Sequence, residues 1–454
     1  MSLIKSEKQK NKRWYKVLIV VLFLSFINYI FWEQLQKGIV AYMIYHKQIF
    51  TPPLKNENES NIKRFLENTL FYWDIADLRI KQKKRVNHFN PTLKPLVREI
   101  NRRQSAGELM QYSMNIYREI RWRLNFTSDS ASTRLRISDL RKSLSAEPAI
   151  QLKGKMQQPS DGSWGYGITV WYLRFYYSVE NLLDSSLQVQ YPYSFLDQIN
   201  SPEKLKKQLE IDLYNNFTQT GMFNREELDE TFSAVARLLN KKKRINYPFH
   251  PQLDSTLNFF VKQWQNPETG CWGQWLIDRN GRLWKMDDMG ITFHVISDLH
   301  GNVEHKDLIA KRLLELDDLD FPTGIRFDGE YNNHLNWDAV KIFRYAWPYL
   351  DIDTKEKVKV EISRMLKWCL AESYQSDGSF KINDLDDTLG DAYSYGVAFL
   401  NETGYFRDSD RFWTNQNFPN AKSVQDHLKA RILSIGLDDP GLKDAYETLN
   451  GKSF

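Results

Sequence analysis

The strongest constraint on this chain is a turn that recurs at a fixed interval. A glycine followed two positions later by an aromatic residue occurs at Gly162, Gly270 and Gly378, spaced 108 residues apart. Similar turns at Gly221 and Gly324 lie near the midpoints of these intervals. Apolar patterns of helical period flank the strongest turns, so a unit of about 54 residues is expected to run helix, turn, helix. Such a period predicts stacked helical hairpins rather than independent domains.

The repeats predict an all-α fold over residues 151–454, which has room for about five or six hairpins. Closure of these hairpins gives an α/α toroid, with inner helices around a funnel and outer helices around them, whereas an open solenoid is the alternative. Aromatic residues make up 14% of the chain, which suits a ring-lined interior. A small β-hairpin is expected at residues 275–285, with a type I′ turn at Asn280-Gly281.

The N-terminal segment predicts a membrane anchor. Residues 17–32 contain no charged side chain and follow six Lys and Arg residues. A basic tail over 1–16 and a single transmembrane helix over 17–36 are therefore expected, and a cleaved signal peptide is the alternative. Because the basic residues precede the span, the N-terminus is expected in the cytoplasm and the toroid outside it.

Residues 37–150 are expected to form a helical juxtamembrane or linker region. The apolar positions of residues 106–124 have a helical period, with an Arg-rich opposite side. Those arginines are expected either to contact anionic lipid or to form a solvated helix face.

Composition excludes several classes of function. The net charge of +5 is small for 454 residues and is spread along the chain, so no nucleic-acid partner is expected. Two distant cysteines, Cys271 and Cys369, do not make a thiolate zinc site, although a disulfide between them stays open. No Gly-rich phosphate loop, nucleophile elbow or His-based metal motif occurs, so neither a cofactor nor a metal is predicted. Protein partners cannot be identified from the sequence.

Two segments resemble a known superfamily. "FVKQWQNPETGCW" (260–272) and "WCLAESYQSDGSF" (368–380) are similar to the QW-type repeat of squalene–hopene cyclases and protein prenyltransferases. "DLDDT" (384–388) resembles the acid motif of class II terpene cyclases. The resemblance implies an α/α toroid and a proton-donating role for Asp386. Class II cyclases have two toroid-type domains, however, and the zinc site of prenyltransferases has no counterpart around either cysteine.

Acidic residues follow four of the five turns. In a closed toroid these turns share one end, where closely spaced carboxylates repel each other, so that one of them holds its proton and becomes a general acid. The candidate catalytic acids are Asp384, Asp386, Asp387, Asp287 and Asp288. Further acids after the turns are Glu226, Glu227, Asp229, Asp328 and Glu330. Helix capping is the alternative role, and Asp384 or Asp387 is expected to cap the helix that begins near Thr388 while Asp386 points into the funnel.

Other polar and aromatic residues near the turns are further candidates. His294 follows Asp288 by six positions and is a candidate catalytic residue. The candidate substrate-binding residues are Trp272, Trp284, His334, Asp338 and Tyr393. Core packing is the alternative role for each of these residues.

Three classes of function follow from these features. The first is an extracytoplasmic enzyme that processes a glycan through acid/base chemistry of carboxylates at the toroid mouth. The second is a terpenoid-cyclase-like enzyme in which Asp386 protonates an isoprenoid, and the third is a binding or scaffold module without catalysis. The expected partners are thus a glycan or a lipid-like small molecule, and the bilayer through residues 17–32.

Overall fold

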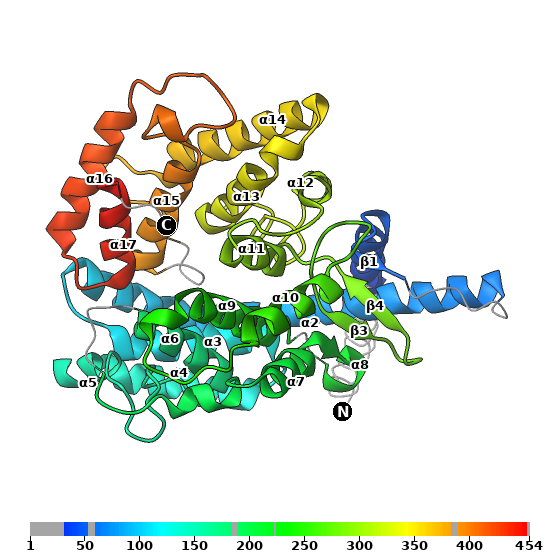
Figure 1. Cartoon of the computed structure of the whole chain (residues 1–454), viewed down its shortest axis with the longest axis horizontal. Helices are drawn as coiled ribbons and strands as arrows, with labels where there is room; N and C mark the ends of the chain where they lie inside the picture. Colours follow the sequence, from blue (N-terminus) through cyan, green and yellow to red (C-terminus); the bar gives the residue numbers. More distant parts are fainter. Residues whose placement is uncertain (1–30, 53–59, 184–188, 222–223, 383–387, 452–454) are drawn as a thin grey trace, which may run out of the picture. The chain divides into compact units, whose positions relative to one another are not determined.

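The computed structural model describes residues 31–52, 60–183, 189–221, 224–382 and 388–451. Within these ranges the chain is mostly helical and contains one small sheet, which agrees with the predicted all-α class (Figure 1). Internal contacts divide the chain into two units, and each is described by itself.

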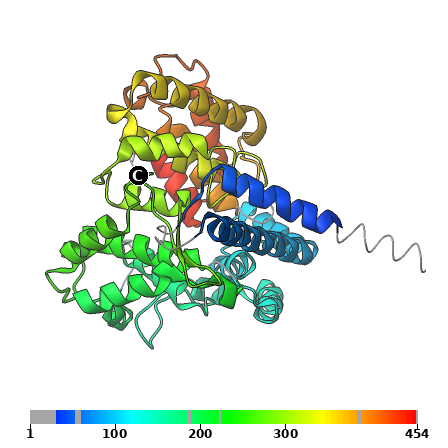
Figure 2. The same cartoon turned by 90° about the vertical axis from the view of Figure 1, so that its right-hand side faces the viewer.

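Unit 1 comprises residues up to 50 and 54–83. Its described part is a helical hairpin in which the helix over residues 31–46 lies beside the first half of α2 (Asn61–Ser105) (Figure 2). Lys37 Nζ lies 2.5 Å from Asp77 Oδ1 across this hairpin, which fixes the two helices in register.

Unit 2 comprises residues 51–53 and 84–454 and includes the rest of α2. Its further helices, in chain order, are α3 (Gln111–Phe126), α4 (Ser130–Leu144), α5 (Pro148–Lys153), α6 (Trp171–Leu183), α7 (Pro202–Leu213), α8 (Phe217–Thr220), α9 (Arg225–Lys241), α10 (Leu253–Trp264), α11 (Met289–Asp298), α12 (Lys306–Glu315), α13 (Asn333–Ala346), α14 (Ile352–Trp368), α15 (Leu389–Glu402), α16 (Ala421–Ile435) and α17 (Pro440–Leu449). The helices α3 to α5 therefore belong to the same unit as residues 151–451.

The helices of unit 2 pack in chain order. Trp122 of α3 contacts Tyr172 of α6 with 5.2 Å between ring centroids, and α6 packs on α9, α9 on α11, α11 on α13, and α13 on α15. The intervening helices pack on members of this row: α4 on α3, α7 and α10 on α9, and α12 and α14 on α13. One row of six helices, α3, α6, α9, α11, α13 and α15, is thus backed by a second set.

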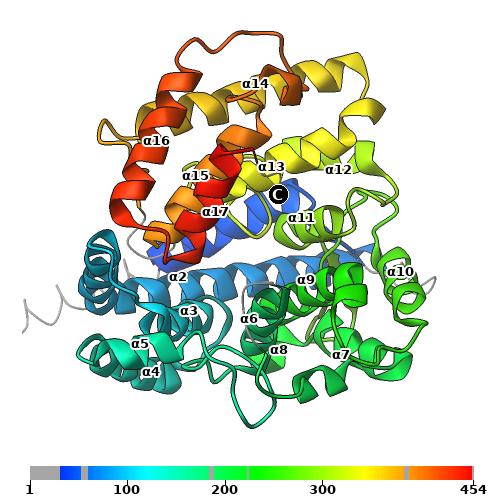
Figure 3. The same cartoon turned by 60° about the vertical axis from the view of Figure 1, so that its left-hand side comes forward.

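The end of unit 2 meets its beginning. α15 packs along α17 (Figure 3). The Leu389 N–H at the start of α15 donates to Asn101 Oδ1 of α2 at 3.2 Å, and Gln104 Nε2 of α2 donates to Asp439 Oδ2 before α17 at 2.8 Å. These bonds join the last helices of the row to the segment that leads into α3.

The five glycines of the repeat lie in non-helical turns, each between two helices, as predicted: Gly162, Gly221, Gly270, Gly324 and Gly378. All except Gly324 have φ between 65° and 79°, a conformation that glycine adopts without steric cost. At Gly162 an added Cβ would also lie 1.8 Å from the carbonyl oxygen of Pro192. Close approach and backbone conformation therefore both require glycine at that turn.

Two of the turns share a side-chain bonding pattern. Gln157 Nε2 donates to the carbonyl oxygen of the turn glycine five residues later and to that of Tyr191, both at 2.7 Å. Gln265 Nε2 likewise donates to the carbonyl oxygen of Gly270, five residues later, and to that of Glu304, both at 2.9 Å. At the third strong turn the Tyr393 hydroxyl donates to the glycine carbonyl at 3.2 Å instead. At each of the three strong turns, a side chain thus donates a hydrogen bond to the carbonyl oxygen of the glycine.

The predicted β-hairpin is present, but its predicted turn type is wrong. β3 (Trp275–Ile277) and β4 (Leu283–Met286) pair antiparallel in a sheet of order β1-β4-β3-β2, where β1 is Phe50–Thr51 and β2 is Tyr214–Asn215. A type I′ turn needs positive φ at two positions, whereas only Gly281 has it, with φ 77°. The Asp278 carboxylate accepts from the N–H groups of Asn280 and Arg282, which favours a three-residue loop with a glycine bulge.

The predicted membrane anchor falls mostly outside the described residues. Residues 17–30 of the expected span, and the basic tail before them, belong to the part that the structure does not describe. None of the helices within the described ranges combines the length and the apolar character needed to cross a bilayer. The anchor therefore stays a prediction.

The amphipathic helix predicted at 106–124 is present as α3, which begins at Gln111. Two of its arginines contact other side chains of unit 2, instead of forming only a solvated helix face. Arg123 Nε bonds Glu119 Oε1 at 2.9 Å, and the Arg118 guanidinium lies 4.7 Å from the centre of the Tyr177 ring of α6.

The glutamine bonds at the turns generate a stability prediction. We expect Gln157→Ala to lower the free energy of unfolding by about 2 kcal/mol, because it leaves two backbone carbonyls without their donor. Gln158→Ala, at the adjacent position, should change it by less than about 0.5 kcal/mol. Urea unfolding followed by circular dichroism measures both, and equal effects of the two substitutions would contradict a structural role for Gln157.

Candidate functional site

Five ionisable side chains from three adjacent helices form what we call the central cluster. Its members are Asp229 and Glu230 of α9, His294 of α11, and His334 and Asp338 of α13. These helices are in the middle of the row that runs from α3 to α15. Because surrounding protein keeps much of the water away, charges in this cluster interact more strongly than charges at an open surface.

A buried arginine holds the cluster in place. Arg225, at the start of α9, is only 1% exposed and donates to three carboxylates: Asp288 at 2.6 Å, Asp229 at 2.5 Å and Glu226 at 2.6 Å. Asp288 also accepts from the Ile291 N–H at 2.9 Å and thereby caps α11. Arg225 thus ties the beginnings of α9 and α11 together and orients Asp229.

The next contact is an ion pair between α9 and α11. His294 Nδ1 lies 2.8 Å from Asp229 Oδ1, although the two atoms are not aligned as a hydrogen bond. Burial alone would lower the pKa of His294, but the Asp229 carboxylate outweighs it and raises that pKa to about 9. Burial would likewise raise the pKa of Asp229, yet His294 and Arg225 hold it at about 2. At neutral pH the pair is an imidazolium and a carboxylate.

Asp338, unlike Asp229, keeps its proton at neutral pH. Burial raises its pKa to about 8, even though the charge of His294 acts to lower it. Asp338 Oδ2 lies 3.8 Å from Nε2 of His334, and burial together with the charge of His294 lowers the pKa of His334 to about 3. The cluster therefore holds a protonated carboxyl beside a neutral imidazole at neutral pH.

Solvent reaches two members of the cluster. The side chains of His334 and His294 keep 37% and 18% of their surface exposed, although burial is the largest influence on the pKa of each. The partial exposure and the effect of burial on the pKa are compatible if protein surrounds each ring on most sides and water contacts it on one side. Water can therefore contact the two imidazoles in the folded chain.

Aromatic rings border the cluster. His334 stacks on Tyr395 of α15 with 3.8 Å between ring centroids and an angle of 9° between the ring planes. Trp337 of α13 contacts Phe293 with 5.2 Å between centroids, and the Lys341 ammonium lies 5.0 Å from the Trp337 ring centre. These contacts combine flat apolar faces with charged groups.

A second ionic network lies between α6, α9 and α11. Arg237 Nη1 donates to Glu180 Oε1 at 2.6 Å and to the Tyr176 hydroxyl at 3.1 Å, while its Nε donates to Asp298 at 3.1 Å. Between the two ends of the row, Arg118 of α3 lies 4.0 Å from Asp391 of α15. All six helices of the row thus contribute polar side chains to this region.

Some buried polar atoms in the region lack a hydrogen-bond partner among the described residues. They include the Tyr172 hydroxyl, Glu230 Oε2 and Asp338 Oδ1. An unsatisfied buried polar atom costs about 1–3 kcal/mol, so such atoms in native proteins usually bind a water, an ion or a ligand. The site therefore has bonding capacity for a polar ligand.

The predicted site residues divide into separate groups. The structure brings His294, His334 and Asp338 together, as described above. Asp288 caps α11 and bonds Arg225, whereas Asp287 bonds Arg312 Nε at 2.8 Å and the Thr269 hydroxyl at 2.9 Å. Both carboxylates are thus engaged in structural bonds, and a catalytic role for them remains an untested prediction.

The predicted aromatic binding residues are buried. Trp272, Trp284 and Tyr393 have no exposed surface, and each uses its polar atom inside the fold. The indole of Trp272 donates to the Val261 carbonyl, and that of Trp284 donates to Asp278. The structure accounts for these three residues by packing, and their predicted part in binding is not tested.

Asp384, Asp386 and Asp387 lie outside the described residues, so their proposed catalytic role stays a prediction. The expected helix cap is a different matter, because α15 begins within the described part. Its N-cap is Thr388, whose hydroxyl accepts from the Asp391 N–H in a capping box. The cap that the structure describes is thus the Thr388 hydroxyl, whereas the predicted cap by Asp384 or Asp387 falls on residues outside the described part.

Sequence reasoning missed the cationic members of the site. Arg225, Arg237 and Lys341 were not candidates, although each lies on the same helix as a predicted or noted acid. Helical spacing was the signal that could have placed Arg237 and Lys341 beside the acids. Glu226, Glu230 and Arg237 recur at intervals that place them near one side of α9, as His334, Asp338 and Lys341 do on α13.

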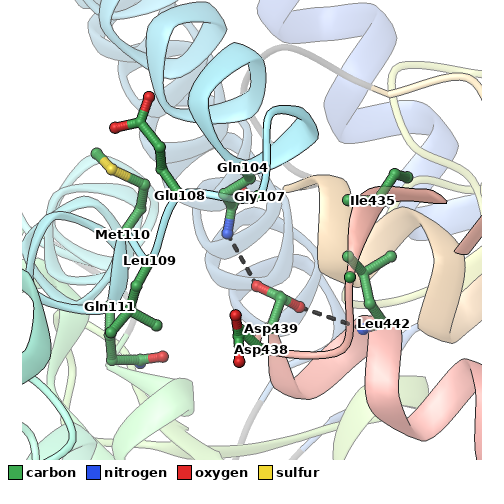
Figure 4. A pocket seen from close by; sticks show the side chains of 11 residues that line it. Gln104, Gly107, Glu108, Leu109, Met110, Gln111, Ile435, Asp438, Asp439 and Leu442 are labelled. Carbon is green, nitrogen blue, oxygen red and sulfur yellow. Dashed lines mark hydrogen bonds between the residues drawn. The ribbon is translucent and has the colours of Figure 1, made fainter. Parts of the chain in front are cut away.

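No group of three or more His, Cys, Asp or Glu side chains within the described ranges is arranged to hold a metal ion. A pocket lies instead where α2 and α3 meet α16 and α17, lined by residues 104, 107–111, 435, 436, 438, 439 and 442 (Figure 4). Gln104 and Asp439 in its wall bond each other, and Asp439 also caps α17 through the Gly441 and Leu442 N–H groups. These bonds serve the junction between the chain's early and late helices.

Comparisons with protein-family models, with curated proteins and with solved structures found no match for this chain.

The ion pair generates a spectroscopic prediction. In the wild-type protein the His294 imidazole should titrate near pH 9 in an NMR experiment, with His294→Gln used to assign its signal. Asp229→Asn should lower that pKa below the ordinary 6.5, because burial then acts without the compensating carboxylate. A wild-type titration near pH 6.5 would show that the pair is not formed in solution.

Proposed function

We propose that unit 2 is a closed α/α toroid whose interior is lined by the central cluster. The ordered packing from α3 to α15 supports closure, as do the bonds from Asn101 and Gln104 to the helices at the end of the chain. The recurring glutamine bonds at the turns agree with the QW-type repeat that the sequence resembles. We therefore also propose a fold-level relationship to the superfamily of squalene–hopene cyclases and protein prenyltransferases.

We infer that the protein is an enzyme that processes a glycan by acid/base chemistry. The observation that carries this proposal is the burial of the Asp338 carboxyl beside His334, which raises the pKa of Asp338 to about 8. A carboxylic acid that keeps its proton at neutral pH is the group that protonates a departing sugar oxygen. Asp229, with a pKa of about 2, provides the contrasting carboxylate that keeps His294 charged.

In the proposed reaction the Asp338 proton passes to the glycosidic oxygen as that oxygen's bond to the anomeric carbon breaks. Water then adds to the carbon and gives a proton to a second carboxyl. Glu180 and Asp391 are the candidates for this second role, because they come from helices of the same row, where Glu180 accepts from Arg237 at 2.6 Å and Asp391 lies 4.0 Å from Arg118. The rings of Tyr395 and Trp337 offer flat faces for a sugar to stack on.

A second candidate reaction is the protonation of an isoprenoid alkene. The same protonated carboxyl and the same aromatic rings favour it, since rings stabilise a carbocation. The charged groups of the site weigh against it, because a hydrocarbon ligand would cover Arg237, Lys341 and Glu230 without bonding them. A polar substrate fits these side chains better, so we favour the glycan.

The proposed location follows from the N-terminal segment. An anchor over residues 17–32, preceded by the basic tail, would hold the chain in a membrane with unit 2 outside the cytoplasm. Glycans of the cell envelope are accessible from that side. This part of the proposal rests on sequence and is independent of the central cluster.

The activity test uses the full-length chain in detergent. Oligosaccharides of neutral, amino and acidic sugars are assayed for new reducing ends, and a polyisoprenoid is assayed for conversion to cyclic products. We expect glycan cleavage in the wild type and a loss of at least about 100-fold in kcat/KM in Asp338→Asn, because the proton donor is removed. Activity should also fall as pH rises through about 8, where Asp338 loses its proton.

Asp353→Asn, an exposed aspartate in the first turn of α14, is the matched control and should keep full activity. Unchanged turnover in Asp338→Asn would exclude that residue as the acid. Conversion of the isoprenoid alone would favour the cyclase reaction. Tight binding of a glycan without turnover would mean that the site is a binding module.

A further inference from the structure

The hairpin of unit 1 exposes an unusual amount of apolar surface. Eleven of the 25 large hydrophobic side chains that are exposed in the described ranges belong to it, although unit 1 contributes only 44 described residues. The eleven are Phe31, Trp32, Leu35, Ile39, Tyr42, Met43, Tyr45, Ile62, Phe65, Leu66 and Leu70. Single exposed apolar residues are ordinary, but a concentration of this kind marks an interaction surface. We call these residues the hairpin surface.

The hairpin surface follows helical spacing on both helices. On the helix over residues 31–46 it recurs at positions 32, 35, 39, 42 and 43, and on α2 it recurs at 62, 65, 66 and 70. Residues at these intervals share one side of a helix. Each helix therefore presents an apolar stripe outward, in addition to the side that packs against its neighbour in the hairpin.

The charges of the first helix are turned away from this stripe. Residues 31–46 contain two charged side chains, Glu33 and Lys37. Lys37 Nζ lies 2.5 Å from Asp77 Oδ1 of α2 and 3.4 Å from Glu33 Oε1, and only 12% of the Lys37 side chain is exposed. The outward side of this helix thus carries no Lys, Arg, Asp or Glu.

On α2 the exposed stripe contains one charge, that of Lys63, whose side chain is 65% exposed. A lysine of this kind can extend its ammonium to a lipid headgroup while its methylene chain stays in apolar surroundings. The stripe is also rich in aromatic residues over the whole hairpin, including Trp32, Tyr42 and Phe65. Aromatic side chains are enriched where a membrane meets water.

The position of the hairpin in the chain identifies its partner. The described hairpin begins at the last two residues of the uncharged apolar run of residues 17–32, and six basic residues precede that run. The helix that leaves this run therefore begins at a membrane surface if the run is in the membrane. We propose that the hairpin surface lies in the interfacial region of the lipid bilayer, so that residues 31–46 and the first turns of α2 form an interfacial membrane-binding hairpin. This proposal goes beyond the single anchor over residues 17–32 and does not depend on catalysis by unit 2.

Site-specific labelling of the full chain tests the proposal. Both native cysteines, Cys271 and Cys369, are buried, so one added cysteine can be labelled selectively with an environment-sensitive fluorophore. Ile39→Cys and Leu66→Cys report on the hairpin surface. Lys81→Cys is the matched control, because Lys81 is exposed on α2 and pairs with Asp77. The labelled proteins are reconstituted in vesicles of phosphatidylcholine and phosphatidylglycerol, with or without a lipid that carries a nitroxide near its headgroup.

We expect the nitroxide lipid to reduce emission at positions 39 and 66 by more than about twofold, and to leave position 81 nearly unchanged, because an interfacial helix buries its apolar side among the lipids. Equal quenching at all three positions, or none, would overturn the proposal. A blue-shifted emission at 39 and 66 without quenching would overturn it as well, since it would mean that protein, such as a second copy of the chain, covers the hairpin surface.

Discussion

The buried guanidinium of Arg225 is the interaction on which the site depends. It is almost completely removed from water and is compensated by Asp288, Asp229 and Glu226 at 2.5–2.6 Å. Burying such a charge is costly unless carboxylates compensate it, and the three partners of Arg225 do so from α9 and from the residue before α11. Through Asp288 the arginine fixes the start of α11, and through Asp229 it sets the charge of His294. The protonation states of Asp338 and His334 then follow from burial and from that charge.

The helix arrangement explains why so many charges can share one region. Each short helix has a first turn with free backbone N–H groups. A carboxylate such as Asp288, at the start of α11, can bond these groups. Glycine at Gly162 allows the close approach of Pro192, and the Gln157 side chain bonds the carbonyl oxygen of that turn. Helices of the row from α3 to α15 carry the charged side chains of the central cluster and of the Arg237 network. Under the proposed closure, this row becomes the wall of a funnel.

The sequence predicted the features that depend on local patterns. The glycine turns, their flanking helices and the hairpin at 275–285 were correct because backbone conformation and periodicity specify them. The type I′ turn was wrong because one nearby side chain, the Asp278 carboxylate, bonds the N–H groups of the loop. The Thr388 hydroxyl, which caps α15, was not a candidate. His294, His334 and Asp338 were candidates from the sequence, whereas Arg225 and Arg237 were not. The bonds of Arg225 to Asp288 and of Arg237 to Asp298 join residues about 60 positions apart, and helical spacing does not reveal a contact at that distance.

The central claim is that a carboxylic acid stays protonated at neutral pH in the middle of this helix row. Infrared difference spectroscopy of the full-length protein, with Asp338→Asn as the reference, detects the carbonyl stretch of a protonated carboxyl directly. The account predicts a band at pH 7 that is absent from the variant and that disappears with a midpoint near pH 8 as Asp338 ionises. A spectrum without that band at pH 7, with the corresponding carboxylate signal already present, would contradict the account.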